Sequence, residues 1–148
     1  MPPAPAVFPI DELDYSGFGN GTKPEVRSGA NGWLWQRDRV SVGGRAYEHG
    51  ATVFGKSSVT IDLNRSCTAY DGVVGVDDLS GGLGAVRFAV DGDGTRLWRS
   101  PVVRGGDPAV PVHVPLAGRK EIRLVVEAQD AVSAVVLADW ARSVITCD

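Results

Sequence analysis

An all-β, antiparallel domain is predicted by three features of the 148-residue sequence. Apolar and polar residues alternate at period two in several segments, which is typical of strands that bury one face. Nineteen glycines and nine prolines supply many turns between those segments. The turns recur about every ten residues, which is the spacing of a β-sandwich or a barrel.

Four segments carry the alternation, and each has a set of apolar residues that we expect to face the core. β-Branched residues fill most of these inward positions, as strands favour. A last strand is expected near the C-terminus, because Trp140, Val144, Ile145 and Thr146 suit a strand better than a short helical turn. The expected core residues, segment by segment, are Val59, Ile61 and Leu63; Val86, Phe88 and Val90; Val110, Val112 and Val114; and Ile122, Leu124 and Val126.

Two glycine-rich runs between strands are interpreted as turns. The DGDG run at 91–94 resembles the start of an EF-hand, but it lacks the third oxygen ligand and the closing Glu. A tight hairpin turn is the better interpretation, since Asp-Gly favours primed turns. The GGLG run at 81–84 lacks the GxGxxG spacing and a following helix. We therefore expect a hairpin loop there and no phosphate site.

The chain is expected to form one domain over residues 11–148, preceded by a tail or linker over residues 1–10. The first ten residues contain four prolines and lack the basic and long apolar regions of a signal peptide. A segment rich in Gly, Ser, Asn and Thr over residues 15–32 has no periodicity. It is expected to be a long surface loop, and such loops are often functional.

Composition excludes several classes of function. The net charge of −3 and the absence of Lys/Arg clusters argue against a nucleic-acid partner or a membrane surface, and no apolar run is long enough to span a bilayer. The two histidines, His49 and His113, belong to no metal pair or catalytic triad. Acidic pairs such as Asp77 and Asp78 are expected to be solvated turn carboxylates. Neither an enzyme nor an oligomer is expected.

The two cysteines, Cys67 and Cys147, leave two alternatives open. They are either two free buried thiols or one disulfide that ties the last strand to the middle of the chain. In the chain-entropy model, closing a loop of roughly eighty residues contributes about 4 kcal/mol to stability. Such a bond persists only in an oxidising compartment.

Tryptophans mark the candidate binding surfaces. Trp33 and Trp35 follow the long loop, Trp98 lies in a predicted strand and is expected in the core, and Trp140 follows Asp139. Trp33 and Trp140 flank predicted loops. They are either partly buried lids on the sandwich or exposed indoles that stack on the C–H face of a sugar.

Six segments, taken in order, make the chain resemble the NPCBM/NEW2 domain, the family-51 carbohydrate-binding modules. The resemblance covers about residues 12–146, and its segments are ANGWLWQRD, GGRAYEHGATVF, SSVTIDL, VVGVDD, VRFAVDGDGTRLWRS and ADWA. It implies a jelly-roll-like antiparallel β-sandwich without catalysis. It also implies attachment to a secreted or cell-surface bacterial glycoside hydrolase, weak binding of galactose-type glycans, and a structural calcium ion.

Two departures from the family pattern fall at polar positions. Phe54 and Gly55 stand where the family often has His-Ala, and Val136 and Leu137 stand where it often has Asp-His before Ala-Asp-Trp. Hydrogen bonds to sugar hydroxyls provide most of the discrimination among sugars. An alternative is therefore a structural or protein-interaction module, or a sensory ectodomain, that keeps the fold and has lost sugar binding.

The residues expected to contact a sugar are Trp33, Asp38, Phe54, Asp139 and Trp140. Trp33 or Phe54 would stack on the ring, and Asp38 and Asp139 would accept hydrogen bonds from hydroxyls. Calcium needs several oxygen donors gathered from loops. The expected donors are Asn20, Asn31 and Asp139. The expected setting is extracellular or on the cell surface, as a monomeric unit tethered to a larger protein.

Overall fold

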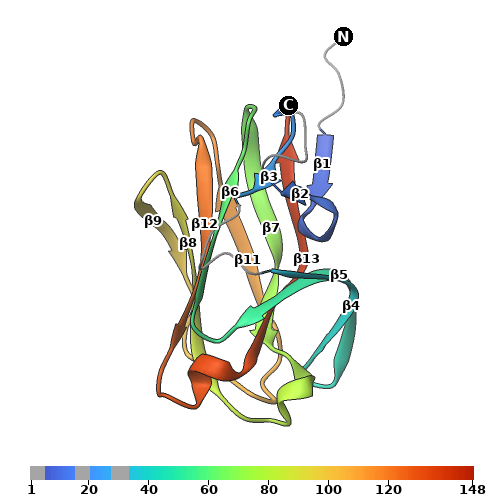
Figure 1. Ribbon diagram of the computed structural model, residues 1–148, viewed down its shortest axis with the longest axis vertical. Coiled ribbons are helices and arrows are strands. Elements are labelled where there is room, and N and C mark those ends of the chain that lie inside the picture. Colours follow the sequence, from blue (N-terminus) through green and yellow to red (C-terminus); the bar gives the residue numbers. More distant parts are fainter. Residues whose placement is uncertain (1–5, 16–20, 28–33) are drawn as a thin grey trace.

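The computed structural model describes residues 6–15, 21–27 and 34–148, which form a sandwich of two sheets (Figure 1). Sheet A has the strand order β11-β7-β13-β5-β4, with β1 added beside β13. Sheet B has the order β10-β8-β12-β6-β3-β2, with β9 added beside β8. All pairs are antiparallel except β2 with β3. The predicted antiparallel β-sandwich is confirmed.

The strands of the two sheets alternate irregularly along the chain. Sheet A consists of β1 (Ala6–Pro9), β4 (Trp35–Val42), β5 (Arg45–Phe54), β7 (Cys67–Val76), β11 (Val110–Pro115) and β13 (Leu137–Cys147). Sheet B consists of β2 (Asp14–Tyr15), β3 (Glu25–Val26), β6 (Ser57–Asp62), β8 (Ala85–Gly92), β9 (Thr95–Arg99), β10 (Val103–Arg104) and β12 (Glu121–Ala128). Three short 3₁₀ turns complete the described structure: η1 (Ile10–Glu12), η2 (Asp78–Ser80) and η3 (Ser133–Val135). No helix in the described ranges is long and apolar enough to cross a membrane.

The core lies between the sheets, and the predicted alternation accounts for most of it. Eleven of the twelve expected core residues are buried, and Val110 is half-buried. At the centre, the Trp140 ring meets the rings of Tyr70 and Phe88 edge to face, with centroids 6.2 and 5.3 Å apart. Trp98 packs against this core from its margin.

The N-terminal segment belongs to the sandwich, so the expected domain start at residue 11 is wrong. Strand β1 pairs with β13, with Ala6 opposite Cys147, and Ile10 is fully buried. The Gln36 side chain donates hydrogen bonds to the Ile10 and Leu13 carbonyl oxygens. Only residues 1–5 of the expected tail lie outside the described ranges.

The predicted loop over residues 15–32 contains a short strand. Strand β3 pairs with β6, and Val26 in β3 is fully buried. A two-residue strand carries too little alternation to be recognised from sequence. Residues 16–20 and 28–33 of this segment lie outside the described ranges.

The cysteines form a disulfide, and the alternative of two free thiols is excluded. Cys67 begins β7 and Cys147 ends β13, where the two strands pair. The bond joins positions 80 residues apart in sequence. The bond fixes β13, the last strand, beside β7 in the middle of the chain. This is the arrangement expected if the two cysteines form a disulfide.

The two glycine-rich runs have different outcomes. Asp93 and Gly94 both have positive φ, at 48° and 84°, and they close the β8–β9 hairpin as predicted. The 81–84 run is not a hairpin loop, because β7 lies in sheet A and β8 in sheet B. It carries the chain from one sheet to the other.

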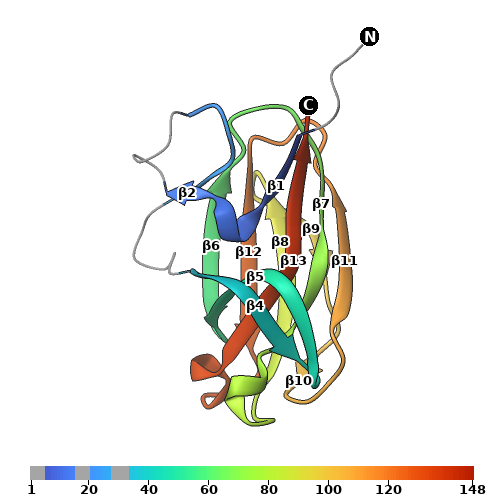
Figure 2. The ribbon, with the colours of Figure 1, turned by 90° about the vertical axis from the view of Figure 1, so that its right-hand side faces the viewer.

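The β4–β5 hairpin folds back over the outer face of sheet A (Figure 2). Val40, Val42 and Tyr47 pack there against Ala141 in a second, smaller apolar cluster. A Cβ atom on Gly75 would lie 2.2 Å from Val42 Cγ1, so a larger side chain would push the hairpin away. This covering hairpin encloses polar groups on a face that would otherwise meet water.

Candidate functional site

Strands β4, β5 and β13 bring a row of side chains together on the outer face of sheet A. Trp35 lies opposite Thr52, and Thr52 lies opposite Asp139. Cross-strand partners share one face of a sheet, and successive residues alternate between faces. Ala51 and Ala138 point into the core, so the row containing Thr52 and Asp139 points away from it.

Arg37 connects this row to the end of β7. Its Nη1 donates hydrogen bonds to Thr52 Oγ1 (3.2 Å) and Asp77 Oδ2 (2.7 Å). Thr52 Oγ1 in turn donates to Asp139 Oδ1 (2.7 Å). The other oxygen of Asp77 accepts from the Leu79 backbone N–H and caps η2. The network therefore holds the Arg37 guanidinium in one position.

The two carboxyl groups of the network are buried. The Asp77 side chain is 1% exposed, so the expectation of a solvated turn carboxylate is wrong for Asp77. Burial, reinforced by the neighbouring Asp77, raises the pKa of Asp139 to about 9. Asp139 is therefore protonated at neutral pH. In this form its carboxyl O–H can donate a hydrogen bond to Asp77, which is the second cause of the raised pKa.

Two aromatic side chains next to this network are exposed. Trp35 is 43% exposed and Phe54 is 46% exposed. Trp35 pairs with Thr52, and Phe54 lies two positions after Thr52 on β5. Trp35 and Phe54 are therefore diagonal neighbours, which in antiparallel strands are about 7–8 Å apart. The Arg37 guanidinium stacks on the Trp35 ring, 4.3 Å from its centroid. We call Trp35, Arg37, Phe54 and Leu137 the aromatic face; Leu137 is the β13 partner of Phe54.

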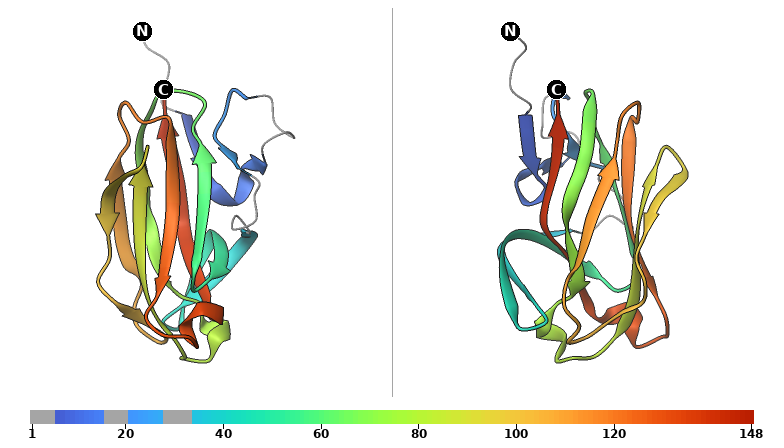
Figure 3. Two further views of the ribbon diagram at one scale, coloured as in Figure 1. Left: turned by 60° about the vertical axis from the view of Figure 1, so that its left-hand side comes forward. Right: turned by 180° about the vertical axis from the view of Figure 1, so that it is seen from behind.

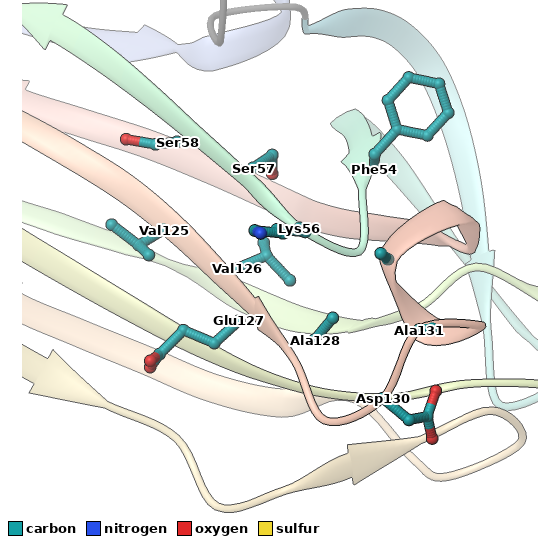
Figure 4. Close-up of a pocket in the computed structure, with 11 residues that line it drawn as sticks. Phe54, Lys56, Ser57, Ser58, Val125, Val126, Glu127, Ala128, Asp130 and Ala131 are labelled. Atoms are coloured by element: carbon teal, nitrogen blue, oxygen red, sulfur yellow. The ribbon is translucent and has the colours of Figure 1, made fainter.

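A separate pocket of about 870 Å³ opens where β5 gives way to β6. The ring of Phe54 extends away from the other side chains labelled in Figure 4. We call this space the side pocket. Its lining residues are Phe54, Lys56, Ser57, Ser58, Val125, Val126, Glu127, Ala128, Asp130, Ala131 and Ala134.

The predicted sugar-contacting residues fall in different environments. Phe54 is on the aromatic face, and Asp139 is fully buried in the neighbouring strand β13. Asp38 is exposed on β4, but it follows Arg37 directly and so points to the opposite side of the strand. Trp140 is fully buried, so the expectation of an accessible indole is wrong for this residue. Trp33 lies outside the described ranges.

The predicted calcium donors are not brought together in the described ranges. Asn20 and Asn31 lie outside them, and Asp139 is enclosed and accepts from Thr52. Within residues 6–15, 21–27 and 34–148, no group of three or more His, Cys, Asp or Glu side chains is arranged to hold a metal ion. Asp139 therefore does not fit the role of a calcium ligand in this arrangement.

Sequence reasoning missed Trp35, Arg37, Thr52 and Asp77. One pattern could have indicated the first two. Trp35 and Arg37 are two positions apart in a strand, which places both side chains on one face. The contact of Arg37 with Asp77 spans 40 residues of sequence, and no local pattern predicts it.

The comparisons with known proteins agree with this fold. A putative endo-alpha-N-acetylgalactosaminidase of Renibacterium salmoninarum is 32% identical over 148 residues, which is 99% of this chain and 10% of that protein. This chain thus corresponds to a small part of that relative.

Solved carbohydrate-binding modules share the sandwich. The CBM51-2 module of Clostridium perfringens ZmpB, solved with GlcNAc and INT domains, has a TM-score of 0.75 at 19% identity over 96% of this chain and 32% of that one. The CBM51 of Clostridium perfringens GH95, solved with methyl-galactose, has a TM-score of 0.71 at 18% identity over 95% of this chain and 99% of that one. At these identities the likeness establishes the fold.

The sequence profile of one family spans almost the whole sandwich, from β1 to β13. It matches residues 7–146, which include the strands that carry the aromatic face and the side pocket. The chain belongs to the NPCBM/NEW2 domain family.

Proposed function

We propose that this chain is a noncatalytic carbohydrate-binding module whose sugar site is the aromatic face. The observation that supports this most directly is the pair of exposed rings, Trp35 and Phe54, on adjacent strands. Exposed aromatic rings offer a flat apolar surface to the C–H face of a sugar. Membership of the NPCBM/NEW2 family gives independent support.

Arg37 provides the polar side of the proposed site. Both of its hydrogen bonds in the described structure come from Nη1. Its Nη2 and Nε donors remain for a sugar hydroxyl, because a guanidinium has five N–H groups. Asp77 and Thr52 hold it in place, so little side-chain entropy is lost on binding.

A neutral hexopyranose is the proposed ligand class. The related modules were solved with GlcNAc and with methyl-galactose, and galactose-type sugars are the first to test. A single sugar ring makes few contacts, so the expected Kd lies on the order of mM to µM. Tethering to a larger protein raises the effective concentration of the site near its substrate.

The proposed setting is an accessory domain of a secreted glycoside hydrolase. The relative named as an endo-alpha-N-acetylgalactosaminidase is about ten times longer than this chain, judged by the 10% that is covered. The start of β1 and the end of β13 pair at one end of the sandwich, while η2, η3 and the end of β5 lie toward the other (Figure 3). Flanking domains would therefore leave the aromatic face accessible.

A protein-interaction module is the second candidate, favoured by a different observation. Four large aliphatic side chains are more than 60% exposed around η2 and η3, at the end opposite the termini: Leu79, Leu83, Val132 and Val135. In this alternative the chain binds no sugar. The exposed Phe54 beside a charged network favours the sugar site over this candidate.

Calcium remains a proposal that depends on Asn20 and Asn31, which lie outside the described ranges. A melting temperature that falls when EDTA is added, and recovers with excess calcium, would support it. A melting temperature unaffected by EDTA would remove it.

The experiment that tests the proposed function is an NMR titration of the whole chain with galactose, N-acetylgalactosamine and GlcNAc at millimolar concentration. At least one sugar should shift the Trp35 indole resonance and amides near Phe54. No shift with any of these sugars, together with no detectable binding on a glycan array, would favour the protein-interaction module. Hydrolysis of an aryl-galactoside by the chain would contradict its noncatalytic nature.

A further inference from the structure

The side pocket adjoins the aromatic face, because Phe54 belongs to both. Phe54 ends β5 in sheet A and Ser57 begins β6 in sheet B, with Lys56 between them. The turn is held rigidly against the η3 segment. The Gly55 N–H donates to the Val136 carbonyl oxygen at 2.8 Å, and a Cβ atom on Gly55 would lie 1.8 Å from the Ser133 oxygen. The path from the aromatic face to the pocket therefore has a fixed shape.

Small residues create the space in the pocket. Ala128, Ala131 and Ala134 line it beside Val125, and short side chains leave the volume open. The volume of about 870 Å³ lies near the upper end of the range for small-molecule sites. This is room for more than an isolated ion or a single small substituent.

The polar lining offers donors and acceptors of both signs. Lys56 supplies a cationic donor, Glu127 and Asp130 supply acceptors, and Ser57 and Ser58 supply hydroxyls. The Ser57 hydroxyl is buried without a hydrogen-bond partner among the described residues.

The acidic side chains are already held by their neighbours. The Asp130 carboxylate accepts from the Ser133 backbone N–H at 2.8 Å, and hydrogen bonds from Ser133 lower the pKa of Asp130. Glu127 pairs with Arg96 and Arg99 at 3.7 and 3.6 Å. Because the acids are balanced by Lys56 and by these arginines, the pocket suits a neutral polyhydroxylated group better than an anion or a cation.

We infer that the side pocket is a second sugar subsite, so that the chain binds an oligosaccharide bent around Phe54, with one residue on the aromatic face and the next in the pocket. This inference rests on the proposed function. It assigns to the pocket a ligand class that fits its size, its short apolar side chains and its mixed polar lining. It also gives Phe54 a place between two sugar residues.

The test compares monosaccharides with disaccharides by isothermal titration calorimetry. The probes are methyl-galactose and GlcNAc, and the matched disaccharides are lactose, N-acetyllactosamine and chitobiose. The variant Ala131→Trp fills the pocket at an exposed position. The control Ala117→Trp makes the same change in an exposed turn outside the pocket.

We expect at least one disaccharide to bind about tenfold more tightly than its monosaccharide. Ala131→Trp should abolish that gain and leave monosaccharide affinity within about twofold, while Ala117→Trp should behave as the wild type. Lys56→Ala, at an exposed position that needs no repacking, should reduce the gain at least threefold.

Three results would overturn the inference. Equal affinity for monosaccharides and disaccharides would do so while leaving the proposed function intact. An undiminished gain in both Ala131→Trp and Lys56→Ala would do so as well. Binding of no sugar by the wild type would overturn the proposed function together with the subsite.

Discussion

Thr52 Oγ1 donates a 2.7 Å hydrogen bond to Asp139 Oδ1 between paired positions of β5 and β13. This contact joins a residue of the covering hairpin to the Ala-Asp-Trp step near the C-terminus. It places a protonated carboxyl in the same cross-strand row as the exposed Trp35, with Thr52 between them. Buried polar groups and exposed rings therefore adjoin one another on the outer face of sheet A.

Replacing Asp139 with Asn should make stability less dependent on pH. Between about pH 4, where an unfolded Asp titrates, and the folded pKa of about 9, the folded state holds a proton that the unfolded state has released. The wild type should therefore lose stability as pH rises through this window. Asn can keep the hydrogen bond from Thr52 without titrating.

Urea unfolding of both proteins at pH 5, 7 and 9 measures this effect. The stability difference should move steadily in favour of Asp139→Asn as pH rises. Parallel pH profiles for the two proteins would show that the folded Asp139 titrates near its ordinary value.

Replacing Arg37 with Ala should be strongly destabilising. Asp77 is 1% exposed and would lose its cationic partner, which typically costs about 3–5 kcal/mol for a buried pair. The double variant Arg37→Ala/Asp77→Asn should recover part of the loss, because Asn can still accept from the Leu79 N–H. Chemical denaturation of the two single variants and the double variant gives the coupling energy. Additive effects would contradict a direct Arg37–Asp77 interaction.

Removing the disulfide should lower stability without changing the fold. Cys67 and Cys147 close a separation of 80 residues, and bonds of this kind typically contribute about 2–4 kcal/mol. The variant Cys67→Ala/Cys147→Ala should unfold at lower urea concentration than the oxidised wild type. Reducing agent should shift the wild type in the same direction and leave the variant unaffected. A variant as stable as the oxidised protein would contradict this assignment.

His49 should titrate above the ordinary histidine pKa. Its Nδ1 donates to Asp11 Oδ2 at 2.8 Å, and this hydrogen bond is the main cause of the raised pKa. The stabilisation is present at acidic pH, where His49 is charged, and is lost as pH rises through the folded pKa. An NMR titration should show the pKa of His49 falling in Asp11→Asn. An identical pKa in that variant would exclude Asp11 as the cause.

The strands could be predicted because their pattern is local. Val59, Ile61 and Leu63 alternate with polar residues within one strand, and such alternation reports which side faces the core. The assignment of strands to sheets is not local. The 81–84 run was expected to close a hairpin, yet it crosses between sheets, because β8 pairs with β12 and β9 instead of β7.

The candidate site was only partly predictable for the same reason. Phe54 and Asp139 could be identified from the family pattern. That pattern could not predict that Phe54 is exposed and that Asp139 is buried. Asp139 is held by Thr52 of the β4–β5 hairpin, 87 residues earlier in the chain. Trp140 adjoins Asp139 on a strand, so it points to the other side and becomes part of the core.

The central claim is that Trp35 forms part of a sugar-binding surface, and calorimetric titration of Trp35→Ala tests it most directly. The control is Val7→Ala, which shortens another exposed side chain at a distance from the site, in β1. With methyl-galactose or GlcNAc, Trp35→Ala should bind at least about tenfold more weakly, a loss of about 1.4 kcal/mol, while Val7→Ala should match the wild type. Wild-type affinity in a folded Trp35→Ala variant would contradict the account.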